Sequence, residues 1–266
     1  MHRDFVEKVL EKVKTDPTIV GLAVGGSWIN NQIDEFSDID FLLITDQLVS
    51  DSTDKMVNYA RGFGKLLNAF TGEHIGEKRL LICMYDDPLI HIDIKFVTRE
   101  EFKSRVENPV ILWDRDGSVQ GLIESTVYFW PEVDYQWLED RFWTWVHYVT
   151  LKIGRGENFE ALDGLSFLRV NVLAPLLQIK NGQLPRGMRR IEKTFNENDL
   201  NDLKNTIPCY SPDSLIDSLT RTIEIYRDLR NRLFNNTIIL RTDTETKCVQ
   251  YFDAIMEKIL KGTNNP

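Results

Sequence analysis

The stretch from residue 19 to residue 44 constrains the fold of this chain more than any other. Residues 19–24 form a short apolar run that ends in a turn of small residues, which is typical of a buried strand leading into a tight turn. The turn consists of Gly25, Gly26 and Ser27. A second apolar run begins beside an Asp-x-Asp pair, Asp38 and Asp40. The turn is suited to cradle a triphosphate, and the carboxylate pair is suited to hold the magnesium that makes a triphosphate reactive.

Length and composition indicate a globular chain with one large domain or two small ones. The chain has 266 residues, of which 42% are hydrophobic and 27% are charged. Its formal net charge of −9 disfavours nonspecific attraction to nucleic acid or to an anionic membrane surface. We therefore expect no nucleic-acid partner, while the same charge leaves room for a small cationic substrate.

Cysteine usage and the N-terminus point to a cytoplasmic protein. The three cysteines, Cys83, Cys209 and Cys248, are far apart and show no metal-ligand spacing, so a disulfide framework is not expected. The N-terminus mixes charges with apolar residues at helical spacing and is not a signal peptide. No apolar run approaches the roughly 20 residues of a membrane span, so we expect no membrane association.

The first half of the chain mixes helical and extended patterns. Helices are predicted at residues 2–15 and 54–70, with a single helical turn at 27–32. Strands are predicted at residues 19–24, 39–44, 79–85, 89–97 and 110–113. This half reads as a mixed β-sheet flanked by helices.

Beyond residue 118 the periodic segments are helical. They cover residues 137–154, 159–181, 212–233 and 244–260. Pro175 should kink or split the second of these, and Asn181-Gly182 is a plausible end for it. We therefore predict an α+β protein with a nucleotide-binding and magnesium-binding domain over residues 1–120. A helical bundle that binds the acceptor is predicted over residues 121–266.

Asp38, Asp40 and the turn carry complementary chemistry. The small residues Gly25 and Gly26 let backbone N–H groups approach phosphate closely, and a helix starting at Ser27 would add a partial positive charge. Alternation along the second strand places Asp38 and Asp40 on one face. Two adjacent carboxylates repel each other unless a cation lies between them, and Mg²⁺ prefers such oxygen ligands. One or two magnesium ions are therefore expected.

A third carboxylate is expected on a neighbouring strand. Alternation along residues 89–97 places His91, Asp93 and Lys95 on one face and the isoleucines on the other. Asp93 could ligate a second metal ion or accept a proton from an acceptor hydroxyl. The plainer alternative is a surface ion pair between Asp93 and Lys95.

The Gly-Ser turn, followed after about ten residues by Asp-x-Asp, resembles the signature of the DNA polymerase β superfamily of nucleotidyltransferases. Residues 34–41 look especially like the aminoglycoside and lincosamide nucleotidyltransferases. The resemblance implies that Gly26 and Ser27 bind the triphosphate, that Asp38 and Asp40 bind magnesium, and that Asp93 is a ligand or base.

Residues 28–31 depart from that family's pattern. Family members often carry a basic residue and a glycine there, whereas this chain has Trp28-Ile29-Asn30-Asn31. Asn tolerates a left-handed turn, so the fold is compatible. Lys152 or Arg155 is a candidate to supply the missing positive charge.

The helix predicted at residues 137–154 offers a candidate acceptor surface. Trp143, His147 and Thr150 share one face, which either lines a cleft or packs within the bundle. Acidic residues are dense around this helix, and they either attract an amine-bearing acceptor or form a solvated rim. They are Asp134, Glu139, Asp140, Glu157, Glu160 and Asp163.

The expected function is Mg²⁺-dependent transfer of a nucleoside monophosphate, with ATP or another NTP as co-substrate, to a hydroxyl of a small cationic acceptor. An aminoglycoside-like or lincosamide-like antibiotic is the model acceptor. One alternative is the nucleotidyltransferase of a toxin–antitoxin pair, to which the spacing of Arg141 and His147 gives faint support. Another is a nucleotide-binding module without turnover.

Overall fold

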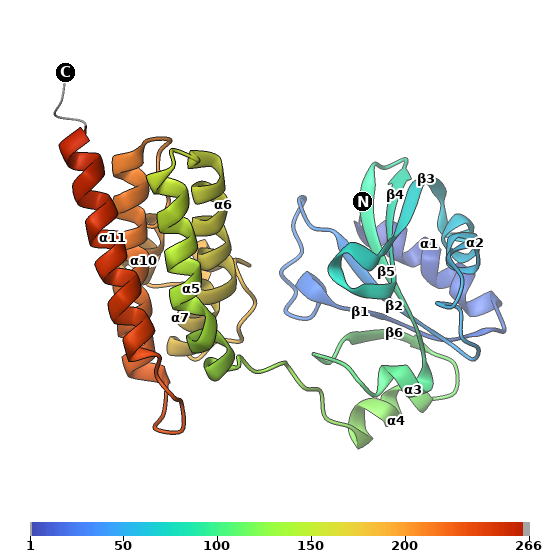
Figure 1. The fold of residues 1–266 in the computed structure, drawn as a ribbon. Helices are drawn as coiled ribbons and strands as arrows, with labels where there is room; N and C mark the ends of the chain where they lie inside the picture. The colour runs from blue at the N-terminus through green and yellow to red at the C-terminus, as the bar shows by residue number, and fades with distance from the viewer. Residues whose placement is uncertain (1, 263–266) are drawn as a thin grey trace. The chain divides into compact units, whose positions relative to one another are not determined.

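The structure, a computed structural model, describes residues 2–262, which form two compact units (Figure 1). The sheet unit runs to Pro131 and the helical unit begins at Glu132. The first unit holds a mixed sheet with flanking helices and the second is built from helices, so the predicted α+β class is confirmed. The boundary predicted at residue 120 falls inside α4 (Ser118–Ser125), a helix that contacts β6 in the sheet unit.

A six-stranded sheet is the centre of the sheet unit. Its strands are β1 (Ile19–Val24), β2 (Ile39–Thr45), β3 (Lys65–Gly72), β4 (Glu77–Asp86), β5 (Ile90–Thr98) and β6 (Val110–Asp114). Their order across the sheet is β3-β4-β5-β2-β1-β6. The pair β2–β5 is parallel, and the other neighbouring pairs are antiparallel. The one parallel pair lies at the middle of the sheet, where the connection from β2 to β5 passes through β3 and β4.

Helices cover both faces of this sheet. They are α1 (His2–Thr15), α2 (Thr53–Phe63), α3 (Arg99–Phe102) and α4, with short 3₁₀ helices η1 (Gly26–Trp28) and η2 (Glu73–Ile75). One core cluster joins α1 and α2 to Ile39, Phe41, Ile92 and Ile94. A smaller cluster joins α3 and α4 to the opposite face. Because side chains alternate along a strand, the residues between those four point toward the face that carries α3 and α4.

The predicted helix over residues 54–70 is wrong in its second half. The helix α2 ends at Phe63, and the residues from Lys65 onward form the edge strand β3, which pairs with β4. Gly64 between them is extended, with φ 173°, and a Cβ there would lie 3.3 Å from the ring of Tyr85. Tertiary pairing with β4 outweighs the helical periodicity of this segment.

The helical unit contains four long helical segments and two short helices. They are α5 (Tyr135–Gly154), α6 (Asn158–Leu168), η3 (Arg169–Leu173), α7 (Ala174–Lys180), α8 (Ile191–Thr194), α9 (Glu197–Lys204), α10 (Pro212–Leu233) and α11 (Thr242–Gly262). Here α6, η3 and α7 form one continuous stretch, and η3 is a π-helical turn. Pro175 follows it in the first turn of α7, so the wider turn accommodates the missing N–H as a local change in the helix.

The segments α8 and α9 were not predicted. The first has four residues, too few to show a periodic pattern, and the second has eight. The side chain of Asn196 caps α9 by accepting from the N–H of Asp199. The Asp199 carboxylate is buried and accepts from Lys180, Asn181 and Asn196, which ties α9 to the end of α7.

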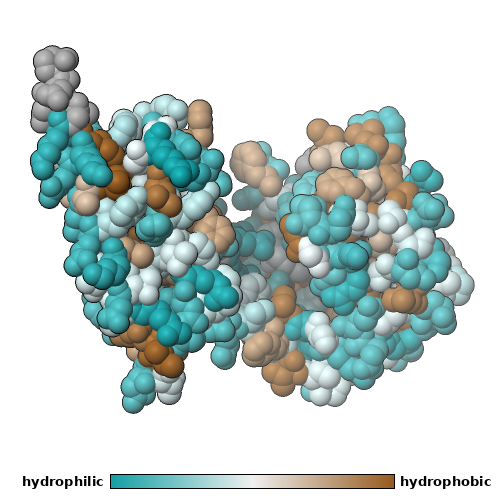
Figure 2. Space-filling view, in the orientation of Figure 1, coloured by the Kyte–Doolittle hydropathy of each residue, from teal (hydrophilic) through white to brown (hydrophobic). Residues whose placement is uncertain are grey.

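The continuous stretch Asn158–Lys180 is long and apolar enough to cross a membrane by length and composition alone, which the search for apolar runs did not anticipate. Half of its most apolar window is buried inside the helical unit, including Leu165, Leu168 and Leu173. A core helix of a soluble domain passes the same test, so this stretch is weak evidence for a span. The visible surface of each unit mixes polar and apolar side chains (Figure 2).

Candidate active site

The three predicted carboxylates share one face of the sheet at the parallel pair β2–β5. Asp40 is the register partner of Asp93, and register partners in a parallel pair point to the same side. Their neighbours Ile39 and Ile92 point to the other face and are fully buried beneath α1 and α2. Asp38 directly precedes β2 and lies two residues before Asp40, so alternation places it on the same side. The parallel pairing brings together the residues that the sequence placed on separate strands.

Asp93 is the most perturbed of these carboxylates. Burial raises its pKa above the ordinary value, the negative charge of Asp38 raises it further, and His91 opposes the shift. The Nε2 atom of His91 lies 2.9 Å from Oδ1 of Asp93. Because the charge of Asp38 acts on Asp93, these two carboxylates lie within electrostatic reach of each other. A carboxyl with a raised pKa is better suited to accept a proton than an ordinary aspartate.

Lys95 does not pair with Asp93, although both lie on the same strand face. Its Nζ lies 2.7 Å from Oε2 of Glu77, at the start of the adjacent strand β4. Arg79 and then Lys95 lower the pKa of the Glu77 carboxyl to about 2. The ion pair considered between Asp93 and Lys95 is therefore replaced by one that draws the lysine toward β4.

The predicted phosphate-binding turn lies beside these carboxylates. The N–H of Gly25 donates to the carbonyl oxygen of Asp40 at 2.8 Å, which fastens the turn to β2. Gly26 has φ 59°, in the left-handed region that favours glycine. Ser27 is 7% exposed, and its Oγ has no hydrogen-bond partner among residues 2–262. A buried hydroxyl of this kind is a fit for an oxygen of a bound ligand.

The helix after the turn is shorter than predicted. A helical turn was expected over residues 27–32, and η1 spans only Gly26–Trp28. The N–H of Gly26 points at Oε1 of Glu107, at the long distance of 3.4 Å. A three-residue helix has little macrodipole, so anion binding here depends on individual N–H groups and the Ser27 hydroxyl.

Magnesium, which the resemblance implies, fits this face by the chemistry of its donors. Carboxylate oxygens from Asp38, Asp40 and Asp93 are the hard ligands that Mg²⁺ prefers, and a triphosphate would complete the coordination. Within residues 2–262, no three or more His, Cys, Asp and Glu side chains are gathered closely enough to hold a metal ion by themselves. The residues thus fit an ion that is held jointly by protein and nucleotide.

The residues that depart from the family pattern have structural roles. Trp28 packs against the core cluster beneath α1 and α2, so its ring supplies packing where a basic residue was expected. Asn31 has φ 51°, which confirms the predicted tolerance for a left-handed conformation. The two lysine and arginine candidates for the missing charge are engaged within the helical unit. Nζ of Lys152 binds Glu157 at 2.7 Å and also Glu160, and Arg155 lies near Glu157.

The proposed acceptor-facing side of α5 is instead part of the bundle. Trp143 is 1% exposed and belongs to the core. The hydroxyl of Thr150 is buried and donates to the carbonyl of Val146 at 2.9 Å. His147 packs on the ring of Tyr251 in α11, with ring centroids 4.8 Å apart. The interpretation of this face as bundle packing is therefore the one that the structure supports.

The six acidic residues near α5 have different environments. Asp134 caps the helix by accepting from the N–H of Trp137, and Glu139 is fully buried. Asp140 pairs with Arg241 at 2.7 Å. The two glutamates at 157 and 160 pair with Lys152, as described above. Asp163 is exposed and lines a pocket between α5 and α6. They form neither one acidic surface nor one solvated rim.

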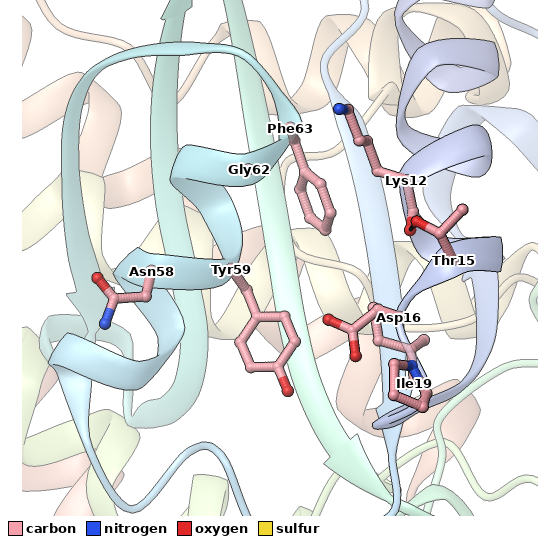
Figure 3. A pocket seen from close by; sticks show the side chains of 9 residues that line it. Lys12, Thr15, Asp16, Ile19, Asn58, Tyr59, Gly62 and Phe63 are labelled. Atoms are coloured by element: carbon pink, nitrogen blue, oxygen red, sulfur yellow. Dashed lines mark hydrogen bonds between the residues drawn. The ribbon is translucent and has the colours of Figure 1, made fainter.

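A larger hollow in the sheet unit is not the predicted site. It has a volume of about 570 Å³ and lies between the end of α1 and α2 (Figure 3). Lys12, Thr15 and Asp16 line it from the α1 side, and Asn58 and Tyr59 line it from α2. The helices α1 and α2 cover the face opposite Asp40 and Asp93, so this hollow and the carboxylates belong to different faces of the sheet.

Sequence reasoning placed His91 on the right strand face but gave it no role. Its position two residues before Asp93 was the available signal, since i and i+2 share a face of a strand. Glu107 was missed altogether. It follows α3 in an irregular segment, and no local pattern connects it with the turn at Gly26.

The fold and the comparisons with known proteins define this protein as a nucleotidyltransferase. The model of the streptomycin adenylyltransferase family matches residues 1–255, and the chain belongs to that family. An adenylyltransferase takes its adenylyl group from a nucleoside triphosphate, so an NTP is its co-substrate. No curated protein sequence matches the chain.

Three solved structures are similar to this chain at low sequence identity. An aminoglycoside 6-adenyltransferase from Bacillus subtilis is 16% identical, with a TM-score of 0.41 over 94% of this chain and 97% of that one. A nucleotidyltransferase-like protein from Exiguobacterium sibiricum is 9% identical, with a TM-score of 0.33 and coverages of 99% and 92%. A spectinomycin adenyltransferase from Enterococcus faecialis, solved with ATP and spectinomycin, is 12% identical, with a TM-score of 0.31 and coverages of 95% and 97%.

Proposed function

We propose that this protein is a Mg²⁺-dependent adenylyltransferase that moves AMP from ATP to a hydroxyl of a small cationic acceptor and releases pyrophosphate. The family match supports adenylyl transfer. The observation that carries the assignment of the site is the register of Asp40 with Asp93, beside a turn that is fastened to Asp40 by a backbone hydrogen bond.

The turn binds the triphosphate in this proposal. The N–H of Gly26 and the hydroxyl of Ser27 donate to phosphate oxygens, and the absence of a side chain at Gly25 leaves the backbone accessible. A Cβ at Gly25 would meet Asp40 Cβ and Oε1 of Glu107 only at ordinary contact distances of 3.7 and 3.8 Å. The small residue at position 25 therefore serves the ligand more than the fold.

Asp38 and Asp40 would hold magnesium, with Asp93 as a third ligand or as the base. Bound Mg²⁺ supplies charge neutralisation at the triphosphate. As base, Asp93 accepts the proton of the acceptor hydroxyl. The acceptor oxygen then forms a bond to the α-phosphorus, the bond from that phosphorus to the bridging oxygen breaks, and pyrophosphate leaves with the electron pair. His91 holds the Asp93 carboxylate in place through the 2.9 Å contact.

The two roles of Asp93 predict different kinetics. If Asp93 is the base, Asp93→Asn lowers kcat about a hundredfold or more while nucleotide affinity changes little. If Asp93 is a metal ligand, both the rate and the affinity for Mg²⁺-nucleotide fall together. Rapid-quench measurement of the transfer step, combined with equilibrium binding of MgATP, separates the two.

The acceptor is proposed to be an aminoglycoside-like or lincosamide-like antibiotic, which would make the protein a resistance enzyme. Related proteins are named for streptomycin and for spectinomycin. The net charge of −9 suits a cationic acceptor. The free thiols of Cys83, Cys209 and Cys248 fit a reducing compartment, so we place the activity in the cytoplasm.

Release of pyrophosphate tests the proposal directly. The full chain is incubated with Mg²⁺ and each of the four NTPs against a panel of aminoglycosides, lincosamides and other amino-sugars. Release with a small acceptor, strongest with ATP and lost in Asp40→Asn, supports the function. Labelling of a protein or RNA instead indicates the toxin-partner alternative. Tight nucleotide binding without release under any condition indicates a binding module and contradicts the proposal.

A further inference from the structure

A pocket of about 220 Å³ lies between α5 and α6, wholly inside the helical unit. Trp145, Tyr148 and Val149 line it from α5. Glu160, Asp163 and Phe167 line it from α6. Within each helix these residues are three or four apart, so each set forms a stripe on one helix face. Two such stripes facing each other make a pocket that each helix alone would not have.

The floor of the pocket requires close approach of the two helices. Gly164 also lines the pocket, and a Cβ there would lie 2.7 Å from Cγ2 of Val149, closer than side-chain contacts permit. A glycine at this position therefore sets the spacing between α5 and α6. The site is built by the fold and is not an accident of one flexible side chain.

Aromatic rings form the walls. The rings of Trp145 and Phe167 meet edge to face, with centroids 5.0 Å apart. Tyr148 is 47% exposed, and its hydroxyl donates to Oε2 of Glu160 at 2.9 Å. Tryptophan, tyrosine and phenylalanine faces attract cations through the ring quadrupole, and tryptophan does so most strongly.

A carboxylate without a partner adds negative charge to these walls. Asp163 has no hydrogen-bond or ion-pair partner among residues 2–262. Glu160, by contrast, already binds Tyr148 and Lys152. The pocket therefore presents one carboxylate that is engaged and one that is available to an incoming cation.

The protein itself places an ammonium group at the border of this pocket. Nζ of Lys152 lies 5.1 Å from the centroid of the Tyr148 ring and binds Glu160 and Glu157. Those carboxylates raise the pKa of the lysine, so it stays charged. The arrangement of ring and carboxylate thus already holds one alkylammonium ion, supplied by the chain.

We propose that this pocket binds the protonated amine of a ring-bearing organic cation. The ammonium lies against Asp163, and the ring of the ligand packs on Trp145 and Phe167. The size of the pocket suits one small ring, because pockets for drug-sized ligands begin at roughly 300 Å³. That this amine belongs to the acceptor of adenylyl transfer rests on the proposed function, whereas cation binding itself does not.

Ligand-observed NMR titration of the full chain with cyclohexylammonium chloride tests the proposal, without nucleotide or Mg²⁺. Cyclohexanol, which has the same ring and no charge, is the matched ligand. We expect saturable binding of the ammonium and at least about tenfold weaker binding of the alcohol, because cation–π attraction and the carboxylate act only on the charged ligand. Equal affinity for the two ligands, or no saturable binding of the ammonium, overturns the proposal.

Two matched variants locate the binding. Asp163→Asn should weaken binding of cyclohexylammonium about threefold to tenfold, whereas Asp253→Asn, an exposed carboxylate on α11, should leave it unchanged. Trp145→Leu should weaken binding of the ring as well as of the charge. Far-UV circular dichroism checks that each variant is folded. An unchanged affinity in Asp163→Asn contradicts the assigned pocket.

Lys152→Met tests the role of the tethered ammonium. Removal of its charge leaves Glu160 free to attract the ligand, so cyclohexylammonium should bind more tightly, and weaker binding would contradict the proposal. The outcome is separable from that of the proposed function. If cations bind here but no acceptor is adenylylated, only the function fails. If acceptors are adenylylated with the same KM in Asp163→Asn, only the pocket fails.

Discussion

The sheet unit and the helical unit treat their buried carboxylates in opposite ways. In the helical unit, Glu139 is fully buried and is supplied with donors from several elements. The hydroxyl of Tyr226 donates to it at 2.6 Å and the N–H of Arg241 at 2.9 Å. Trp143 Nε1 and Arg230 Nη1 each lie 3.4 Å away. Such a carboxylate is satisfied by the protein and has no capacity left for a ligand.

In the sheet unit, Asp93 is half-shielded from water, and burial raises its pKa more than His91 lowers it. The nearby charge of Asp38 adds to the cost of ionisation. The difference teaches how to distinguish structural from functional carboxylates. A structural carboxylate has its charge compensated within the fold, whereas a functional one retains a charge that a ligand can compensate.

The largest expected effect breaks the functional side of this comparison. Asp40→Asn should lower the rate of adenylyl transfer about a thousandfold or more, because it removes a charged ligand of the magnesium that supports the transition state. Its melting temperature should not fall. Glu11→Gln, an exposed change on α1, is the control and should keep full activity. Pyrophosphate release and thermal denaturation measure the two properties, and loss of activity together with unfolding would assign Asp40 to stability.

The next effect breaks the structural side. Glu139→Leu should destabilise the helical unit by about 3 kcal/mol, because it leaves the Tyr226 hydroxyl and Arg230 without a buried partner. Adding Tyr226→Phe should recover part of the loss, since the orphaned hydroxyl is then absent. Urea denaturation followed by circular dichroism gives the free energies of unfolding.

Asp140→Asn is the matched control for Glu139→Leu. Asp140 is the next residue on α5 and pairs with Arg241 at the surface, so its removal should change stability little. Equal losses from the two variants would show that burial of Glu139 has no special consequence.

A smaller effect separates the two glycines of the turn. Gly26→Ala should destabilise the sheet unit by about 1–2 kcal/mol, because φ is 59° there and an L side chain is strained in that region. Gly25→Ala should fold with little loss, because its φ of −106° is ordinary and there is space for a Cβ. Both should weaken MgATP binding if the backbone of the turn contacts phosphate. Chemical denaturation that shows equal losses for the two variants would contradict the left-handed strain.

The smallest expected effect concerns pH. A carboxyl whose pKa is raised by folding contributes stability below its unfolded pKa and loses it as pH rises through the folded value. Asp93→Asn removes the ionisable group, so the variant should melt about 2–4 °C higher than the wild type at neutral pH. The difference should vanish at about pH 3, where the wild-type carboxyl is protonated. Differential scanning calorimetry across this range checks the sign, and a lower melting temperature for the variant at neutral pH contradicts it.

Much of the fold could be predicted where a local pattern coincides with a single element. The helix at residues 2–15, the strand at residues 19–24 and the helix at residues 212–233 have the same bounds in the structure. The segment after Gly64 could not be predicted, because its apolar spacing suits a helix and only pairing with β4 makes it a strand. The face of α5 that carries Trp143 was ambiguous, because an isolated helix does not reveal which neighbour covers it.

By itself, the sequence determined which residues of each strand share a face, because alternation along an extended chain is a local property of the backbone. It also determined that a turn must follow residue 24, since the glycines there allow a conformation that other residues resist. Only the tertiary structure decided that β2 lies beside β5 in the register that pairs Asp40 with Asp93. It likewise decided that Glu139 is compensated and Asp163 is not. The solvation and charge of a side chain depend on elements far apart in the chain, and no local pattern encodes them.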